Sequence, residues 1–442
     1  MYLDANATHP LLPSVRAGLA QAILNEDPVI SNPSSIHQRG QVARSRIAAL
    51  KNTLCEILGR PDRDEFVMVS GATEAINLSL RGFVADRQFN RRPVTVIGTD
   101  VDHSAVVDTM KDLASQDLEV QWVGVDASGQ PDSEQLKSRI RESVAAHRDV
   151  LLCLQVANNE VGSVPNLLPL LQDLYQEHGP KALNTKTRLK GGRVPQTPQV
   201  LWVMLDLAQA VGKLDESWLR PLMHFADYAV ISAHKLGGPT GVGALWQRPS
   251  APLKAQITGG PQERRRRAGT MPQVAAYGFH LALLDWQKNG TAYRAQWAEL
   301  QSRLAAELAQ IPGLHLHACG PGHSLPGLRN TLNFHVDGCV EESLLLALDL
   351  EGVCVSSGSA CNSGSLKPSP VIMALGYPES VALSSIRVSW GVETQWNDLQ
   401  TFCRILTAKV DQIRRARIES AALFQSSTES SGDSNVTEAR LS

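Results

Sequence analysis

Residues 228–246 read YAVISAHKLGGPTGVGALW, an apolar run that ends in a lysine and a series of glycines. The run at 228–231 is typical of a buried strand, and Lys235 follows it closely. Glycines at 237, 238, 241 and 243 allow a tight turn before a second strand begins near Ala244. A lysine pressed against packed strands is desolvated, which lowers the pKa of its amine and favours Schiff-base chemistry. The alternative is a surface lysine in a glycine-rich hairpin, because such loops alone are weak motifs.

The whole chain is long and nearly neutral, with 442 residues, 43% of them hydrophobic, and a formal net charge of −2. This length allows two globular domains. The charge gives no footprint for nucleic acid or an anionic membrane, and no apolar run reaches the roughly 18 residues of a membrane span. We therefore expect neither partner. The arginines at 264–267 form the one basic cluster, in a loop that holds a phosphate or is simply solvated.

The seven cysteines are unevenly spaced and form neither a disulfide framework nor a paired CxxC site, so we expect no metal. The N-terminus lacks a basic region followed by an apolar one, which argues against a secretory signal. Both features suit a reducing cytoplasm, where a free thiol can be a nucleophile. Cys361 is the candidate, because small polar residues flank it at 356–364 and indicate an exposed loop.

Strand and helix patterns alternate up to Lys235. This predicts an α/β domain whose largely parallel sheet has helices on both faces. The strands are expected at 65–69, 94–98, 119–123, 150–156, 200–205 and 228–232, and the helices at 38–58, 72–81, 105–114, 136–146 and 167–178. In such a sheet, polar residues beyond the strand carboxyl ends meet in one crevice. Here those residues are Thr73, His103, Asn158, Asp206, Gln209 and Lys235.

Beyond residue 260 the pattern changes to a smaller α+β domain. Its helices are expected at 273–310, 341–350 and 397–415, and its strands at 329–336 and 385–390. The predicted divisions are an arm at 1–13 that joins the small domain, a large domain at 14–260, a small domain at 261–420 and a tail at 421–442. The tail is too polar to pack and is expected to be disordered. Residues 179–199 are basic and aperiodic, and are interpreted as an inserted loop.

Each polar residue has an ordinary interpretation beside a chemical one. Asp206 caps a helix, or its carboxylate keeps a pyridine nitrogen protonated while Gln209 donates to a phenolic oxygen of the same ring. His103 is a loop histidine, or an acid/base group that stacks on the ring. The turn at 70–74 is an ordinary cap, or it binds a phosphate at a helix N-terminus. Arg387 is a surface residue, or it binds a substrate carboxylate.

These stretches resemble the pyridoxal-phosphate cysteine desulfurases of the NifS/IscS group. The matching motifs are YLD at 2–4, SNPSSIH at 31–37, SGATE at 70–74, HSAV at 103–106, NNEVG at 158–162, DLAQ at 206–209, SAHK at 232–235, QERRRRAGT at 262–270 and SSGSAC at 356–361. The resemblance implies a type I aminotransferase-like fold, a homodimer with shared sites, and conversion of L-cysteine to L-alanine. The sulfur would pass through a Cys361 persulfide to an acceptor protein, for iron–sulfur cluster assembly or another thio-modification pathway.

By position, the resemblance also implies the site residues. The ring of pyridoxal 5′-phosphate would be held by Lys235, Asp206, Gln209, His103 and Asn158. Its phosphate would be held by Ala72, Thr73, Ser232, His234 and, from the neighbouring subunit, Thr270. The substrate carboxylate would be bound by Arg387, Asn158 and Asn32. Lys235, His103 and Cys361 would carry the catalysis.

The sequence departs from this family at two positions. Met204 stands where histidine is common, and Val392 where arginine is common. Neither change removes an implied site residue, but with the insertion they suggest a diverged member with its own sulfur acceptor. The alternatives are a selenocysteine lyase, another pyridoxal-phosphate enzyme such as an aminotransferase, and a scaffold that has lost activity.

Overall fold

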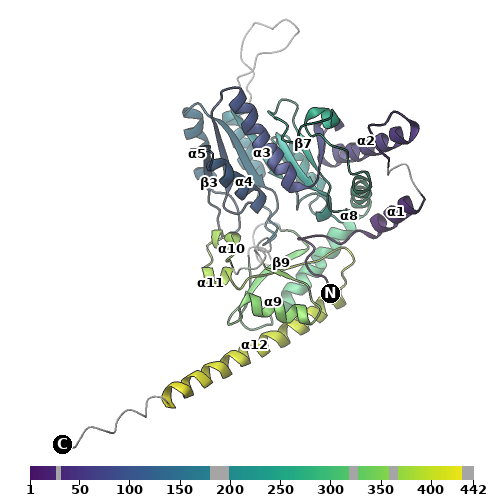
Figure 1. Cartoon of the computed structure of the whole chain (residues 1–442). Helices are drawn as coiled ribbons and strands as arrows, with labels where there is room; N and C mark the ends of the chain where they lie inside the picture. Colours follow the sequence, from purple (N-terminus) through teal and green to yellow (C-terminus); the bar gives the residue numbers. More distant parts are fainter. Residues whose placement is uncertain (26–30, 180–198, 318–326, 358–366, 431–442) are drawn as a thin grey trace, which may run out of the picture.

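The computed structural model describes residues 1–25, 31–179, 199–317, 327–357 and 367–430 (Figure 1). A seven-stranded sheet forms the large domain, in the order β1-β7-β6-β5-β4-β2-β3. Its strands are β1 (Phe66–Val69), β2 (Val94–Thr99), β3 (Glu119–Val123), β4 (Asp149–Gln155), β5 (Leu201–Asp206), β6 (Tyr228–Ser232) and β7 (Gly243–Gln247). Adjacent strands from β3 to β6 are parallel, and β7 runs antiparallel to both of its neighbours. The predicted α/β fold with a mainly parallel sheet is confirmed.

Helices cover both faces of this sheet. They are α1 (Pro13–Leu24), α2 (Gln38–Leu58), α3 (Ala72–Phe89), α4 (Ser104–Ala114), α5 (Ser133–Ala145), α6 (Leu167–His178), α7 (Glu216–Met223) and α8 (Gln273–Leu308). Every residue of β4 is buried: Leu151 and Cys153 pack into the cluster of α3 and α4, while Leu152 and Leu154 pack into the cluster of α6 and α7. Burial on both faces explains why the strands are apolar runs without alternation.

The turn between β6 and β7 accommodates the N-terminal arm. Gly237 has φ of +82°, and a Cβ atom there would lie 2.6 Å from the Leu12 side chain, so only glycine fits. The amide of Leu12 donates to the Gly237 carbonyl (3.0 Å), and the amide of His9 donates to the His234 carbonyl (2.9 Å). The arm therefore lies directly against the turn that carries Lys235.

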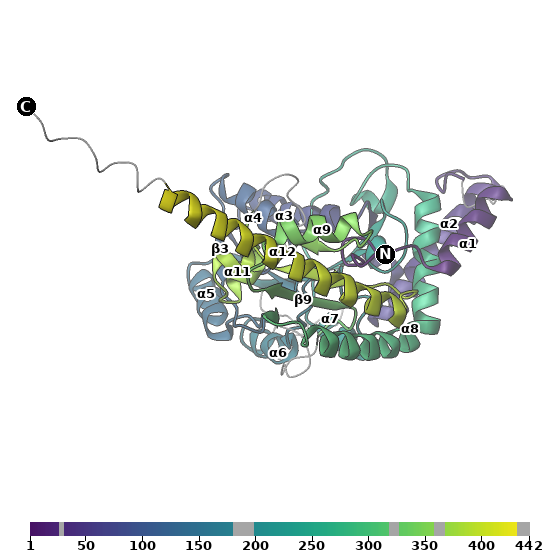
Figure 2. The same ribbon diagram turned by 90° about the horizontal axis from the view of Figure 1, so that it is seen from below.

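The small domain is built on an antiparallel sheet in the order β10-β11-β9-β8. Its elements are β8 (Leu314–Leu316), β9 (Thr331–Val336), α9 (Glu341–Leu350), β10 (Ser356–Ser357), α10 (Pro370–Ala374), α11 (Glu379–Ala382), β11 (Ile386–Ser389) and α12 (Trp396–Ser430). The arm joins this sheet, because the Leu3 carbonyl accepts from the Ser389 amide (2.8 Å) and the Leu3 amide donates to Cys354 (2.8 Å). Figure 2 shows α12 crossing the small domain beside α9.

Several boundaries differ from the sequence predictions. Helix α3 continues well past residue 81 to Phe89. The prediction of a disordered tail from residue 421 is wrong for its first part, since α12 continues to Ser430; residues 431–442 lie outside the described residues. The expected insertion at 179–199 also lies almost wholly outside them. Within the described part, neither α8 nor α12, the longest helices, contains the apolar window that a membrane crossing needs.

Candidate active site

Lys235 ends a short 3-10 turn, Ala233–Lys235, directly after β6. Its Nζ donates to the backbone carbonyls of Asn6 (2.8 Å) and Ala7 (2.9 Å). The amine is therefore oriented by the N-terminal arm, on a turn whose flanking strands are fully buried. Lys235 thus lies on the turn of the antiparallel β6–β7 hairpin, partly buried and with its amine bound by the arm.

Asp206 closes β5, the strand beside β6, and its side chain is buried. Its Oδ1 accepts from the Ala208 amide (2.9 Å), so it does cap the following turn. Burial raises the pKa of this carboxyl, while the hydrogen bond from the Ala208 amide and the positive charge of Lys235 act in the opposite direction. A buried carboxylate of this kind is stabilised by a cationic partner, which a protonated pyridine nitrogen would supply.

Gln209 forms hydrogen bonds with Asn6 and Lys213, two residues that the sequence analysis missed. Its Nε2 donates to the Asn6 carbonyl (3.0 Å), and its Oε1 accepts from Lys213 Nζ. Lys213 also donates to Asn6 Oδ1 (2.8 Å) and is only 2% exposed. Burial holds the pKa of Lys213 well below its usual value, and the charges of Lys235 and Arg387 lower it further. The sequence signal that could have identified Lys213 was its position four residues after Gln209, because side chains at this spacing can contact each other.

The start of α3 forms a cradle for an anion. The helix begins at Ala72, and the side chain of Thr73 is exposed. Ser232 is fully buried beside Gly71, and its Oγ has no hydrogen-bond partner among the described residues. A buried hydroxyl without a partner is costly, so its place at a helix N-terminus fits a phosphate group. Glu74 fixes the turn by accepting from the Ser70 amide (2.7 Å).

The two predicted histidines lie near this cradle and near Asp206. His103 caps α4, and its Nδ1 accepts from the Ala105 amide (3.1 Å), so the neutral ring carries its proton on Nε2. His234 Nδ1 contacts the hydroxyl of Thr8 (3.1 Å). Burial and the charges of two lysines lower the pKa of His234 to about 4, which keeps it neutral.

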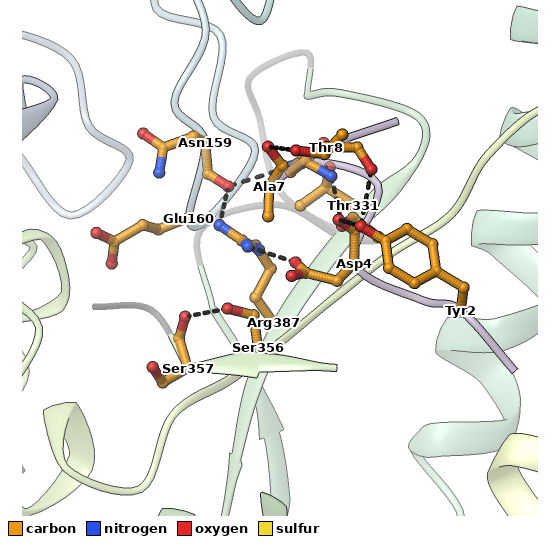
Figure 3. A network of polar contacts seen from close by, with 12 residues as sticks. Tyr2, Asp4, Ala7, Thr8, Asn159, Glu160, Thr331, Ser356, Ser357 and Arg387 are labelled. Atoms are coloured by element: carbon orange, nitrogen blue, oxygen red, sulfur yellow. Dashed lines mark hydrogen bonds and ion pairs between the residues drawn. The ribbon is translucent and has the colours of Figure 1, made fainter. Parts of the chain in front are cut away.

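Arg387 lies on β11, buried between the small sheet and the arm (Figure 3). One terminal nitrogen binds the Asp4 carboxylate (2.6 Å), and the other donates to the Asn159 carbonyl (3.1 Å). Its Nε has no partner among the described residues. The hydroxyl of Tyr2 holds the arm in place through the carbonyls of Asp4 (3.1 Å) and Thr8 (2.8 Å).

Other predicted residues are not brought into this arrangement. Asn158 is buried, and both ends of its amide bond within its own loop and the neighbouring backbone. Asn32 is exposed and caps the Ser34 amide (2.9 Å), and Thr270 is exposed on the segment before α8. Cys361 lies outside the described residues. The roles of these residues stay predictions.

A lysine after β6, a buried acid after β5 and an anion cradle at α3, all at one edge of a mainly parallel sheet, define a pyridoxal-phosphate type of α/β fold. The chain matches the family of class V aminotransferases over residues 1–181 and 196–402, and it belongs to that family.

Characterised relatives cover nearly the whole chain. A cysteine desulfurase IscS from Pectobacterium atrosepticum is 32% identical over 94% of this chain and 93% of its own. Among solved structures, a NifS-like protein is 26% identical, with a TM-score of 0.78 over 93% of this chain and 99% of its own. DndA from Streptomyces lividans is 27% identical, with a TM-score of 0.67 over 88% and 99%.

Proposed function

We propose that this chain is a pyridoxal-phosphate-dependent cysteine desulfurase, which converts L-cysteine to L-alanine and leaves the sulfur on Cys361 as a persulfide. The observation that carries the proposal is the meeting of Lys235, Asp206 and the Ser232 hydroxyl at the carboxyl edge of the parallel strands. The similarity to a cysteine desulfurase over 94% of the chain supports the same reaction.

Pyridoxal 5′-phosphate fits the residues that are present. Lys235 would bind its aldehyde carbon and Asp206 its ring nitrogen, with Gln209 at the phenolic oxygen. Its phosphate would lie at the α3 N-terminus, where Ser232 would gain the partner that it lacks among the described residues. When bound, this cofactor supplies a protonated ring that withdraws electrons from the neighbouring substrate carbon.

The chain's own residues then bind the substrate and move protons. Asp206 keeps the proton on the ring nitrogen, because a buried carboxylate favours a cation beside it. Lys235 Nζ takes the proton from the substrate Cα, and the neutral His103 offers its Nε2–H as a hydrogen-bond donor in the same site. The Nε edge of Arg387 binds the substrate carboxylate.

Sulfur leaves through Cys361. Its thiolate attacks the substrate sulfur, a sulfur–sulfur bond forms as the Cβ–S bond breaks, and the substrate carbon keeps the electron pair and takes up a proton. The products are alanine and a Cys361 persulfide, whose outer sulfur passes to an acceptor protein. Delivery to iron–sulfur cluster assembly is consistent with the relatives' names.

We extend the proposal to a homodimer in which Thr270 of one subunit reaches the cofactor phosphate of the other. The exposure of Thr270 supports this role. A cytoplasmic location stays a prediction from the cysteine usage.

The decisive measurement is alanine release from L-cysteine, with a reductant present, by the wild type, Cys361→Ala and Lys235→Ala. We expect the wild type alone to turn over. If Cys361→Ala keeps full activity, the cofactor chemistry stands but the role of Cys361 is wrong. If the wild type releases alanine only from selenocysteine, the reaction is that of a selenocysteine lyase, and if it releases none from either substrate the proposal fails.

A further inference from the structure

Polar residues alternate along the paired ends of β8 and β9, far from the Lys235 turn in the sequence. His315 and His335 are directly opposite in the antiparallel register. The His317 amide donates to the Asn333 carbonyl (2.8 Å), which extends the pairing, and Asp337 follows β9. Because side chains alternate between faces along a strand, these five lie on one face of the sheet. Leu314, Leu316, Phe334 and Val336 occupy the other face and pack on the core.

Three of these side chains converge. The rings of His315 and His335 are stacked, with centroids 4.8 Å apart. Asp337 reaches both rings: its Oδ2 lies 3.0 Å from His315 Nε2, and its Oδ1 lies 3.7 Å from His335 Nε2. The three donor atoms all lie within 4.8 Å of one another. Zinc bonds of about 2.0–2.2 Å place two ligand atoms roughly 3–3.6 Å apart, so small rotations complete the set.

A chain of hydrogen bonds fixes which nitrogen of His335 is available. Asn333 Nδ2 donates to the Glu160 carbonyl (3.2 Å), so its Oδ1 must accept from His317 Nδ1 (2.7 Å). His317 is fully buried, and its Nε2 lies 2.7 Å from His335 Nδ1, so the second ring nitrogen of His335 already has a buried hydrogen-bond partner. The other ring nitrogen, Nε2, faces Asp337 and is the one available to a metal ion.

We propose that His315, His335 and Asp337 bind a divalent transition-metal ion of the zinc class, with His317 and Asn333 as positioning residues. Two imidazole nitrogens and one carboxylate suit such an ion better than magnesium or calcium, which prefer oxygen ligands alone. A buried partner on the second ring nitrogen is the usual support of a metal-binding histidine.

The surroundings indicate an open site. The side chains of His315 and Asp337 are 55% and 63% exposed, so solvent reaches the ion, and coordination positions remain for water or another ligand. Arg414 donates to the backbone carbonyl of Asp337 (3.1 Å) and leaves the carboxylate oxygens to the imidazoles. Its positive charge opposes a cation nearby, so we expect moderate affinity. The simpler account is a surface ion pair between His315 and Asp337.

The test is Co²⁺ binding to the full-length holoenzyme, followed by visible absorption in a Cys361→Ser background that removes a competing thiol. We expect one Co²⁺ per chain at this site, displaced by Zn²⁺ and not by millimolar Mg²⁺ or Ca²⁺. His315→Ala and Asp337→Asn change exposed side chains, so the fold should be retained, and each should weaken binding by at least about tenfold. His224→Ala removes another exposed histidine and should leave binding unchanged.

A positioning role for His317 has its own readout. His317→Gln should weaken Co²⁺ binding roughly 10–100-fold while the shape of the absorption band is kept, because the ligands themselves are unchanged. Zn²⁺ should also raise the melting temperature of the parent and not of His315→Ala. No Co²⁺ uptake, equal affinity in His315→Ala and Asp337→Asn, or displacement by Mg²⁺ would each overturn the proposal. None of these measurements uses alanine release, so the outcome of the metal-binding test is independent of the proposed function.

Discussion

Arg387 is buried and held through two of its three guanidinium nitrogens. Asp4 and the Asn159 carbonyl bind its terminal nitrogens, while Nε has no partner among the described residues. A carboxylate that binds side-on would use Nε and the outer hydrogen of the nitrogen that Asp4 contacts. In the proposed substrate complex, Asp4 would therefore orient Arg387 as well as neutralise its charge.

This geometry predicts graded effects on cysteine binding. Arg387→Lys loses the pair of guanidinium N–H groups that can bind a carboxylate through two hydrogen bonds. It should raise KM for cysteine by roughly 10–100-fold, since a hydrogen bond to a charged group contributes about 1.5–3 kcal/mol. Asp4→Asn keeps the Arg387 guanidinium but loses the carboxylate that orients it, so KM should rise by a smaller factor with kcat retained. Steady-state kinetics on both variants check this. Unchanged KM in Arg387→Lys would place the substrate carboxylate elsewhere.

Asp102 predicts a pH-dependent stability. Its carboxyl is buried and accepts from the Thr99 amide (2.7 Å), and burial raises its pKa from 3.8 to about 7. Between pH 3.8 and pH 7 this carboxyl is ionised in the unfolded chain but still protonated in the folded protein. The free energy of unfolding therefore falls as the pH rises through this range, and it becomes constant above about pH 7. The free energy of unfolding of Asp102→Asn, measured relative to wild type, should therefore increase by on the order of 4 kcal/mol from pH 4 to pH 8.

Urea unfolding across this pH range measures the Asp102 effect. Asp108→Asn, on the exposed side of α4, is the matched control for the loss of an aspartate carboxyl. A pH-independent difference between Asp102→Asn and wild type would show that Asp102 is ionised throughout.

At the scale of elements, the N-terminal arm connects the two sheets through Asn6. Its side chain accepts from Lys213 (2.8 Å) and donates to the Thr331 hydroxyl (2.8 Å) and the Asn159 carbonyl (3.1 Å). Asn6→Ala leaves these buried groups unpaired and should lower the free energy of unfolding by about 3 kcal/mol. Asn6→Asp keeps a hydrogen-bond acceptor for Lys213, so its free energy of unfolding should fall by less. Equal losses in denaturant unfolding would mean that Lys213 does not depend on Asn6.

Long periodic elements could be predicted from the sequence, and contacts between distant segments could not. Helix α2 was predicted at 38–58, where the structure has it, because its apolar spacing is regular and Gly59, at φ of +63°, ends it. Strand β8 was missed because three residues carry too little pattern. The pairing of Asp4 with Arg387 spans 383 positions, and no local signal encodes it. The expectation of no metal site rested on cysteine spacing, which does not register histidines on alternate strand positions.

At the scale of the molecule, the end of α1 and the start of α2 lie at the same side of the large domain (Figure 1). Ile36 is 89% exposed and Leu24 is 81% exposed. Large apolar side chains left in water on one side of a protein are typical of a subunit interface. Because Thr270 is assigned to the neighbouring subunit's cofactor in the proposed homodimer, a lost interface should also weaken cofactor binding.

Ile36→Asp should therefore convert the proposed dimer to a monomer, since a carboxylate buried at that interface would have no partner. Sedimentation velocity reports the mass, and titration with pyridoxal 5′-phosphate reports the affinity, which should fall in parallel. Phe89→Asp is the matched control, because Phe89 is similarly exposed (78%) but lies at the far end of α3 from the cradle. A dimeric Ile36→Asp would move the interface to another surface, whereas a monomer with full cofactor affinity would remove Thr270 from the site.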